Sequence, residues 1–237
     1  MISEKEFIFN FSFFWKSILP TSSLFLKKIN DELYTKEYEY LNSGITGRRR
    51  SFISYVSFQI YVCFANKQYQ EDQFTFETYK LIEPEYIKRF CELDSDDSEI
   101  TLPLNVIEYE ETMILAQRLY KFFSSNYNNQ IVTNPAFKGC GYLNNCYGDI
   151  IADDTLYEIK MVNRNFRIQD CKQLLTYSAL NYATKQYQIN NVALFNSRSG
   201  KLVKMNIDDF CLTLSGKSAT FLFGEIIEFI SGGGVSR

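Results

Sequence analysis

Histidine is absent from this sequence of 237 residues. Its absence excludes every mechanism that needs an imidazole, among them Ser-His-Asp hydrolysis, His-Glu-x-x-His zinc sites and His-dependent nucleases. Any catalysis must therefore use carboxylate, Lys, Tyr or Cys side chains, or a bound metal ion.

The chain also lacks a basic excess, a long apolar run and a secretory signal. Lys and Arg number 25 against 28 Asp and Glu, so the net charge is −3, which argues mildly against tight unspecific DNA binding but permits a local basic channel. No apolar run reaches transmembrane length, and Asn10 and Ser12 interrupt Phe7–Trp15, unlike a signal peptide. We expect a cytoplasmic protein with no membrane partner, whose six cysteines are reduced thiols.

The chain is long enough for one large domain or for a core with an added module. Aromatic residues are plentiful, with 17 Tyr and 21 Phe. An acidic polar stretch, Glu92–Glu99, is typical of an exposed connector. We therefore predict an aromatic-rich, mainly helical N-terminal module over residues 1–98 and a second domain over residues 99–237.

Within the N-terminal module we expect three elements. Met1–Ile18 is compatible with a strand followed by a turn, and Thr21 or Ser22 is a plausible cap for a helix that extends to Tyr40. Ser51–Ala65 is apolar and aromatic, which favours a buried helix, although periodicity alone leaves a strand open.

The second domain is organised around the stretch Gly148–Lys160. Its two halves are apolar and rich in β-branched or aromatic residues, and between them lie two turn-forming residues, Asp153 and Asp154. This pattern predicts a β-hairpin whose register places Asp149 opposite Glu158. Opposed residues in an antiparallel pair have Cβ atoms about 5 Å apart and project from the same face.

Lys160 shares that face because side chains alternate along a strand. Like charges directly opposed are destabilising, so something must compensate Asp149 and Glu158. Lys160 is one candidate and a divalent cation is the other, since Mg²⁺ prefers oxygen ligands and is commonly held by one or two carboxylates. The alternative for these three residues is a solvent-facing strand with scattered charges.

A helix is expected after the hairpin, from Gln169 to Ala183, with Gln173 and Tyr177 as neighbours on one face. Gly-Asp, then Glu-Ile-Lys, then Gln-Leu-Leu-Thr-Tyr resembles the PD-(D/E)xK, or restriction-endonuclease-like, nuclease superfamily. The resemblance covers residues from about 108 to about 206. It departs from the family pattern in one place, because Asp149 follows a glycine and not a proline.

The expected order of elements in this domain is helix, strand, hairpin, helix, strand, strand, helix. This order suits an α/β fold with a mixed β-sheet flanked by helices, and the resemblance implies that the fold is a restriction-endonuclease-like core. The resemblance also implies Mg²⁺, for which Mn²⁺ can substitute, with Asp149, Glu158 and the Ile159 carbonyl as its ligands.

Three further side chains take roles that the resemblance implies. Lys160 would orient or help to deprotonate the attacking water. Gln173 would brace the site and Tyr177 would contact a phosphate, although ordinary helix polarity also accounts for these two residues.

The helix before the hairpin often supplies another acid in this superfamily, and Glu111 and Glu108 are the candidates. Both equally suit the start of a helix that Asn105 caps.

Five arginines are candidate nucleic-acid ligands. Arg164 and Arg167 lie between the Lys160 strand and the following helix, and the planar guanidinium fork suits phosphate. A plain solvated loop is the alternative for both. Arg48, Arg49 and Arg50 form the most basic point of the chain and suit either a phosphate backbone or ion pairs with acidic neighbours.

The function that these residues predict is a Mg²⁺-dependent nuclease that hydrolyses phosphodiester bonds of nucleic acid, with DNA favoured, as the nuclease subunit of a defence, restriction or repair system. A protein partner subunit and a homo-oligomer both stay open. Two alternatives remain: a catalytically silent nuclease-like subunit that binds DNA or a partner, and a structural protein that docks through its aromatic N-terminal module.

Overall fold

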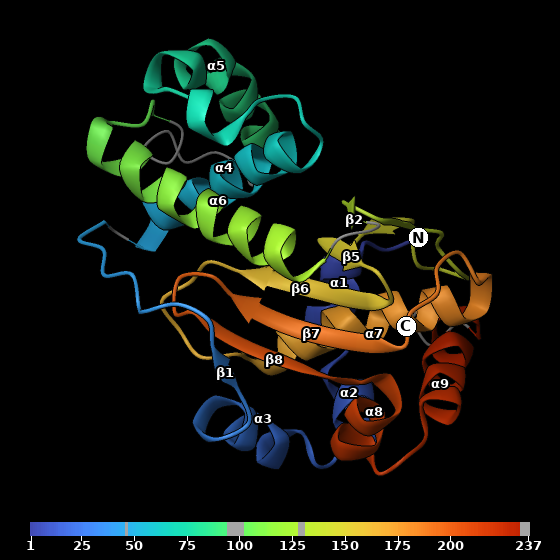
Figure 1. Cartoon of the computed structure of the whole chain (residues 1–237). Coiled ribbons are helices and arrows are strands. Elements are labelled where there is room, and N and C mark those ends of the chain that lie inside the picture. Colours follow the sequence, from blue (N-terminus) through green and yellow to red (C-terminus); the bar gives the residue numbers. More distant parts are fainter. Residues whose placement is uncertain (46, 94–101, 128–130, 233–237) are drawn as a thin grey trace.

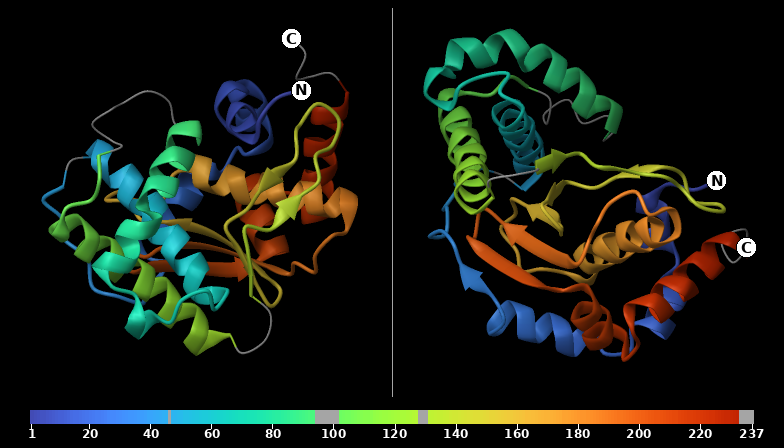
Figure 2. Two further views of the ribbon diagram at one scale, coloured as in Figure 1. Left: turned by 90° about the horizontal axis from the view of Figure 1, so that it is seen from above. Right: turned by 45° about the vertical axis from the view of Figure 1, so that its right-hand side comes forward.

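The computed structural model describes residues 1–45, 47–93, 102–127 and 131–232. A mixed β-sheet lies between two groups of helices (Figure 1). The helices α4, α5 and α6 cover one face of the sheet, and α7, α8 and α9, together with the N-terminal helices, lie on the other (Figure 2). The prediction of a mixed sheet flanked by helices is confirmed.

The described helices are α1 (Glu4–Asn10), α2 (Ser12–Ile18), α3 (Ser22–Asp31), α4 (Gly47–Ala65), the short 3₁₀ helix η1 (Glu71–Gln73), α5 (Phe76–Leu93), α6 (Val106–Asn126), α7 (Ile168–Thr184), α8 (Ile207–Ser215) and α9 (Ala219–Ser231). The described strands are β1 (Thr35–Lys36), β2 (Ile131–Thr133), β3 (Ala136–Phe137), β4 (Cys146–Tyr147), β5 (Ile150–Ala152), β6 (Thr155–Lys160), β7 (Asn191–Asn196) and β8 (Lys201–Asn206).

The main sheet has the strand order β1-β8-β7-β6-β5-β2. The β6–β7 pair is parallel and the other neighbours are antiparallel. A parallel pair needs a crossover connection, and α7 supplies it between β6 and β7. The central strand β6 therefore has a two-residue hairpin on one side and a helical crossover on the other.

The predicted hairpin is confirmed as β5–β6. Ile150 pairs with Tyr157 and Ala152 with Thr155, so the loop consists of Asp153 and Asp154. Asp153 has a φ of 50°, a left-handed conformation that Asp tolerates better than most residues. One step beyond the last paired residues, the same register places Asp149 opposite Glu158.

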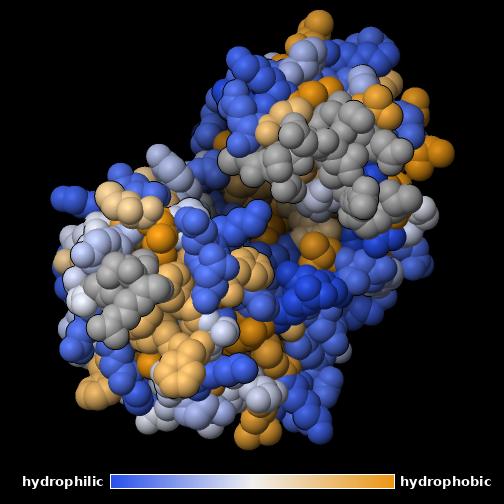
Figure 3. Space-filling model, turned by 180° about the vertical axis from the view of Figure 1, so that it is seen from behind, coloured by the Kyte–Doolittle hydropathy of each residue, from blue (hydrophilic) through white to orange (hydrophobic). Residues whose placement is uncertain are grey.

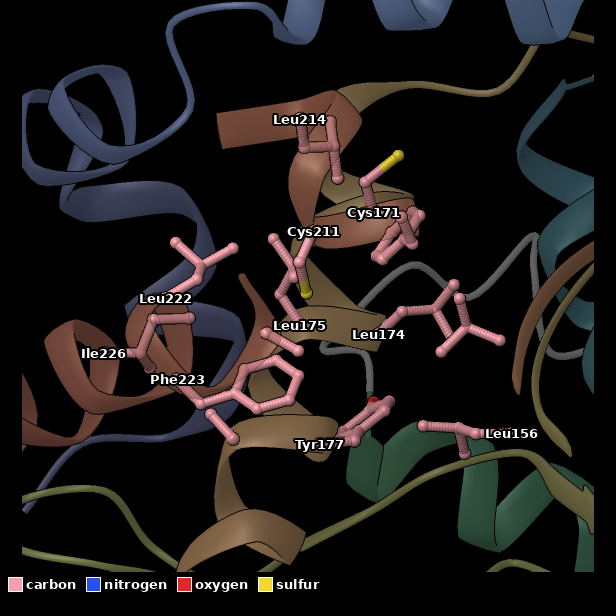
Figure 4. Close-up of a cluster of buried hydrophobic side chains, with 14 of the residues drawn as sticks. Leu156, Cys171, Leu174, Leu175, Tyr177, Cys211, Leu214, Leu222, Phe223 and Ile226 are labelled. Atoms are coloured by element: carbon pink, nitrogen blue, oxygen red, sulfur yellow. The ribbon is translucent and has the colours of Figure 1, made fainter. Parts of the chain in front are cut away.

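Alternate residues of β6 belong to two separate hydrophobic cores. Leu156 belongs to the core formed with α7, α8, α9 and the N-terminal helices, and Figure 4 shows it beside Tyr177 of α7. Tyr157 and Ile159 pack with α4, α5 and α6 on the opposite face. Because side chains alternate along a strand, Glu158 and Lys160 point to the same side as Leu156, toward α7.

The strand expected within Met1–Ile18 is wrong, because this segment forms the helices α1 and α2. The start of α1 has a local cause: Ser3 caps the helix, and Glu6 returns a hydrogen bond to the Ser3 N–H, which is a capping box. The helix expected to reach Tyr40 ends at Asp31. The helix expected over Ser51–Ala65 is confirmed as the greater part of α4.

The predicted boundary between residues 98 and 99 lies outside the described residues, and the division into two domains stays a prediction. The helices of the first 98 residues pack in two places: α1 and α3 contact α7 or α8, whereas α4 contacts α6.

The structural alternative needs aromatic side chains of the N-terminal module to be exposed for docking. Phe7 and Trp15 are buried, whereas Phe9 and Phe13 are 57% and 86% exposed.

All six cysteines carry free thiols. Over the described ranges, no single helix combines the length and the apolar character needed to cross a bilayer, although the pair α8 and α9, bent by 69°, passes that test when its two helices are joined.

Candidate active site at the end of the β5–β6 hairpin

The three charged residues predicted from the hairpin form one cluster. Asp149 accepts a hydrogen bond at Oδ2 from the backbone N–H of Ile159, at 2.7 Å. Lys160 Nζ lies 2.5 Å from Glu158 Oε1. The Asp149 contact bridges from the start of β5 to the end of β6, so the two carboxylates lie side by side as the register requires.

The helix α7 holds the amine of Lys160 from the other side. Lys160 Nζ donates to Gln173 Oε1 at 2.9 Å and lies 3.5 Å from Asp170 Oδ1. The predicted bracing role of Gln173 therefore has a geometric basis. Sequence reasoning missed Asp170, although an acid three residues after a helix boundary is a recognisable capping signal.

Asp170 is saturated with donors, unlike the carboxylates of the hairpin. Arg164 binds it through both terminal nitrogens, at 2.7 and 2.9 Å, and the backbone N–H of Arg167 donates to Oδ2 at 2.8 Å. Burial alone would raise the pKa of Asp170, but Arg164, Lys160 and the Arg167 N–H together hold that pKa below its ordinary value. Asp170 therefore stays ionised and steadies Lys160.

Glu158 differs from Asp170 in both its hydrogen bonding and the direction of its pKa shift. Its side chain is 3% exposed, and no hydrogen-bond partner among the described residues reaches its buried Oε2. Burial, and then the charge of Asp149, raise the pKa of Glu158 well above its ordinary value despite the contact with Lys160. The pKa of Asp149 is also raised, chiefly by burial. The charge of Lys160 alone therefore does not offset burial and the mutual repulsion of the two carboxylates.

Lys160 remains cationic in this environment. Burial would lower the pKa of its amine, but the charges of Glu158, Asp170 and Asp149 outweigh burial and raise it. An ammonium group whose pKa is raised is a poor base and a good hydrogen-bond donor. Of the two roles predicted for Lys160, the structure favours orienting and charge stabilisation over deprotonation of water.

A third carboxylate, Glu4 on α1, interacts with the cluster. It is not predicted from the sequence. The pKa of Glu4 is raised by burial, against hydrogen-bonding interactions with Tyr177 and Gln173. Tyr177 itself is 2% exposed, and its ring stacks on Phe137 with a centroid distance of 5.3 Å. No local signal in the sequence connects Glu4 to a hairpin that begins more than 140 residues later.

The additional acid predicted from α6 is not brought to this cluster. Glu108 is bound by Arg49 Nε at 2.7 Å, and Glu111 by Arg198 at 2.5 Å. Both acids lie on α6, which covers the opposite face of the sheet from α7. Each is already compensated by a buried guanidinium, so Glu4 is the further acid near Asp149 and Glu158.

The cluster opens into a cleft of about 690 Å³ between α4 and the end of β6, whose lining includes Asp149 and Lys160. A view of the molecule from behind shows a hollow between the α4–α6 side and the sheet side (Figure 3). Three of the five predicted nucleic-acid ligands line the cleft, namely Arg50, Arg164 and Arg167.

The other two predicted nucleic-acid ligands are placed differently. Arg49 is 9% exposed and is held internally by Glu108 and by the Pro103 carbonyl oxygen, 2.9 Å away. The alternative expected for the triple Arg, an ion pair with an acidic neighbour, therefore holds for Arg49. The side chain of Arg48 lies outside the described residues.

The donor chemistry of the cluster fits a hard divalent cation. Within the described part of the chain, no group of three or more Cys, Asp and Glu residues is arranged as a metal site, so protein carboxylates would supply only two ligands. Mg²⁺ usually keeps several waters and needs only one or two carboxylates. The unpartnered Glu158 Oε2 is the atom that such a cation would satisfy.

Comparisons with protein-family models, with curated proteins and with solved structures gave no match. The functional interpretation therefore depends on the geometry of the cluster and on the cleft into which it opens.

Proposed function

We propose that this protein is a Mg²⁺-dependent nuclease of the PD-(D/E)xK type that hydrolyses phosphodiester bonds, with DNA as the favoured substrate. The observation that carries the proposal is the pair of half-buried Asp149 and buried Glu158, which share one ammonium group, leave a carboxylate oxygen unpartnered and border an Arg-lined cleft. Perturbed carboxylates of this kind at a cleft mark functional sites.

Asp149 and Glu158 would hold the Mg²⁺, with the Ile159 carbonyl as a further ligand. The bound ion polarises the phosphoryl oxygen and lowers the pKa of a bound water. Lys160 orients that water and stabilises negative charge that develops on the phosphate. Because Lys160 is held by Glu158, Gln173 and Asp170, its ammonium group is fixed before the substrate arrives.

Gln173 and Tyr177 act through other residues in this proposal. Gln173 positions Lys160, and Tyr177 positions Glu4 beside the carboxylate pair. The burial of Tyr177 argues for this positioning role over the phosphate contact expected from the sequence.

One observation favours the alternative of a catalytically silent, nuclease-like subunit. Glu158 already has Lys160 as a counter-ion at 2.5 Å, so a metal is not needed to neutralise the first carboxylate. Asp149 forms no ion pair of its own within the described residues, which is why catalysis is the preferred proposal.

A cleavage assay tests the proposal. Plasmid, linear duplex and single-stranded DNA are incubated with the protein and Mg²⁺ or Mn²⁺, and products are resolved on gels. We expect Asp149→Asn and Lys160→Ala each to lower the cleavage rate at least about a hundredfold, with the circular dichroism spectrum unchanged. Asp153→Asn, which changes an exposed turn carboxylate, is the matched control and retains the wild-type rate. Cleavage by both site variants at the wild-type rate would discard the site.

A further inference from the structure

The cleft beside the candidate site has two chemically different walls. One wall carries Asp149, Lys160 and the segment that follows β6, and the other is a face of α4. Ser54 on α4 lies where the two walls meet. Its hydroxyl donates to the Arg50 carbonyl oxygen of the same helix at 2.8 Å and is 3.2 Å from the Met161 carbonyl oxygen, so α4 and the segment after β6 are in contact at this point.

The α4 wall presents aromatic surface to the cleft. Tyr55 and Phe58 are three residues apart on α4 and both line the cleft, as neighbours on one helical face do. Tyr55 is braced from behind by Phe90 and Tyr86, with centroid distances of 5.3 and 6.5 Å. A half-buried ring that is held in this way offers a rigid π surface at low cost in conformational entropy.

The charges of the cleft favour an anionic strand. Its lining includes four cationic side chains and one carboxylate, in a chain whose net charge is −3. Two of the four cations, Lys160 and Arg164, have carboxylate partners. Arg50 and Arg167 form no ion pair within the described ranges, and Arg50 Nε is buried without a hydrogen-bond partner. Both guanidinium groups therefore have donors for phosphate.

The size of the cleft matches a short stretch of single strand. A volume of about 690 Å³ lies in the range of about 300–1,000 Å³ that encloses a drug-sized ligand, which is comparable to one or two nucleotides and far smaller than a double helix. Basic grooves lined with aromatic rings are the usual way in which proteins hold unpaired strands.

We infer that the cleft binds a single-stranded segment of nucleic acid, with an unpaired base stacked on Tyr55 or Phe58 while Arg50 and Arg167 contact phosphates that flank the site. The inference rests on the proposed function in placing the scissile phosphate between Asp149 and Lys160. The substrate class would then be single strands, or unpaired ends and gaps of duplexes.

Binding of three labelled probes tests the inference by fluorescence anisotropy, in EDTA so that no cleavage occurs. The probes are a short oligothymidylate, an abasic strand of the same length and a duplex of the same length. We expect the wild-type protein to bind oligothymidylate at least tenfold more tightly than the other two. Tyr55→Leu and Phe58→Leu keep apolar volume but remove the ring, and together they should weaken oligothymidylate binding about five- to a hundredfold and leave abasic-strand binding unchanged.

Phe13→Leu is the matched control, because Phe13 is an exposed ring on α2, away from the cleft, and its removal should change nothing. Equal affinity for abasic and base-bearing strands, or tighter binding of the duplex, would overturn the inference. Mg²⁺-dependent cleavage is measured in parallel, with the same proteins and probes but without EDTA. Strand-selective binding without cleavage supports the inference and overturns the proposed enzymatic activity, whereas cleavage with no dependence on Tyr55 and Phe58 does the reverse.

Discussion

The pKa values of buried carboxylates are shifted in opposite directions on the two faces of the sheet. On the α6 face, Glu108 is bound by Arg49 and by the Asn105 N–H, and although burial opposes it, these contacts hold the pKa of Glu108 below its ordinary value. On the α7 face, burial and the neighbouring Asp149 raise the pKa of Glu158 well above its ordinary value.

The difference separates charges that support the fold from charges that serve a site. A buried ion pair contributes to stability only when its remaining donors and acceptors are satisfied. Glu108 approaches that condition, because both of its carboxylate oxygens accept from Arg49. On the α7 face Glu158 keeps an unpartnered oxygen and faces the like charge of Asp149. Like charges so placed oppose folding, so the comparison predicts that the Asp149–Glu158 pair is kept for what it binds.

The largest effect on stability should come from breaking an α6 pair. Arg198→Ala leaves Glu111 buried and unpaired, and we expect it to lower the free energy of unfolding by about 3–5 kcal/mol. Urea denaturation followed by circular dichroism measures this change.

Glu158→Gln is the counterpart on the α7 face. It removes a carboxylate whose charged form is disfavoured by burial and by Asp149, and Lys160 keeps Asp170 and Gln173 as partners. The free energy of unfolding should therefore stay within about 1 kcal/mol of the wild type or rise. A loss as large as that of Arg198→Ala would show that the two faces do not differ.

Gln173→Ala tests how much the site depends on the positioning of Lys160. Removing the Oε1 acceptor, 2.9 Å from Nζ, should reduce kcat about tenfold, as is typical for groups that orient a metal site or its partners, with little change in KM. Gln169→Ala, one turn earlier on α7, is the matched control. Equal rates for the two variants would assign Gln173 to ordinary helix polarity.

The pH dependence of stability should have opposite signs on the two faces. Glu158 has a raised folded pKa, so its contribution is present below the unfolded pKa of about 4.3 and is lost as the pH rises through the folded pKa. Glu108 has a lowered folded pKa, so its contribution is present above about 4.3 and is lost as the pH falls.

The difference in unfolding free energy between the wild type and Glu158→Gln is measured from about pH 4 to pH 8, and the difference between the wild type and Glu108→Gln from about pH 2 to pH 5. The two differences should have slopes of opposite sign, each below about 1.4 kcal/mol per pH unit for one proton. Slopes of the same sign would contradict the assignment of the two carboxylates.

The sequence predicts the site where its geometry is local. Two turn residues and the alternation of a strand suffice to place Asp149, Glu158 and Lys160 on one face, and a helical spacing suffices for Gln173. Residues that reach the site from far along the chain are not accessible to this reasoning. Glu4 on α1 is the main example, and α1 itself begins at the Ser3–Glu6 capping box, within the segment for which the sequence analysis predicts a strand.

The two acids on α6 show the same limit of local sequence patterns, because their partners are distant in the sequence. Glu108 and Glu111 suit a metal site by type and by position on the chain, but their partners lie 59 and 87 residues away. Nothing near Glu111 in the sequence reveals that Arg198 neutralises it. Whether a carboxylate is satisfied depends on tertiary contacts, and this property separates the candidate site from the structural ion pairs.

Isothermal calorimetry of Mn²⁺ binding tests most directly whether the Asp149–Glu158 pair is kept for a cation. We predict saturable binding by the wild-type protein, abolished by Asp149→Asn but retained by Asp153→Asn, with an affinity that rises from pH 6 to pH 8 because the cation displaces protons from carboxylates whose pKa is raised. Absence of binding, or binding that is unchanged by Asp149→Asn, would contradict the account.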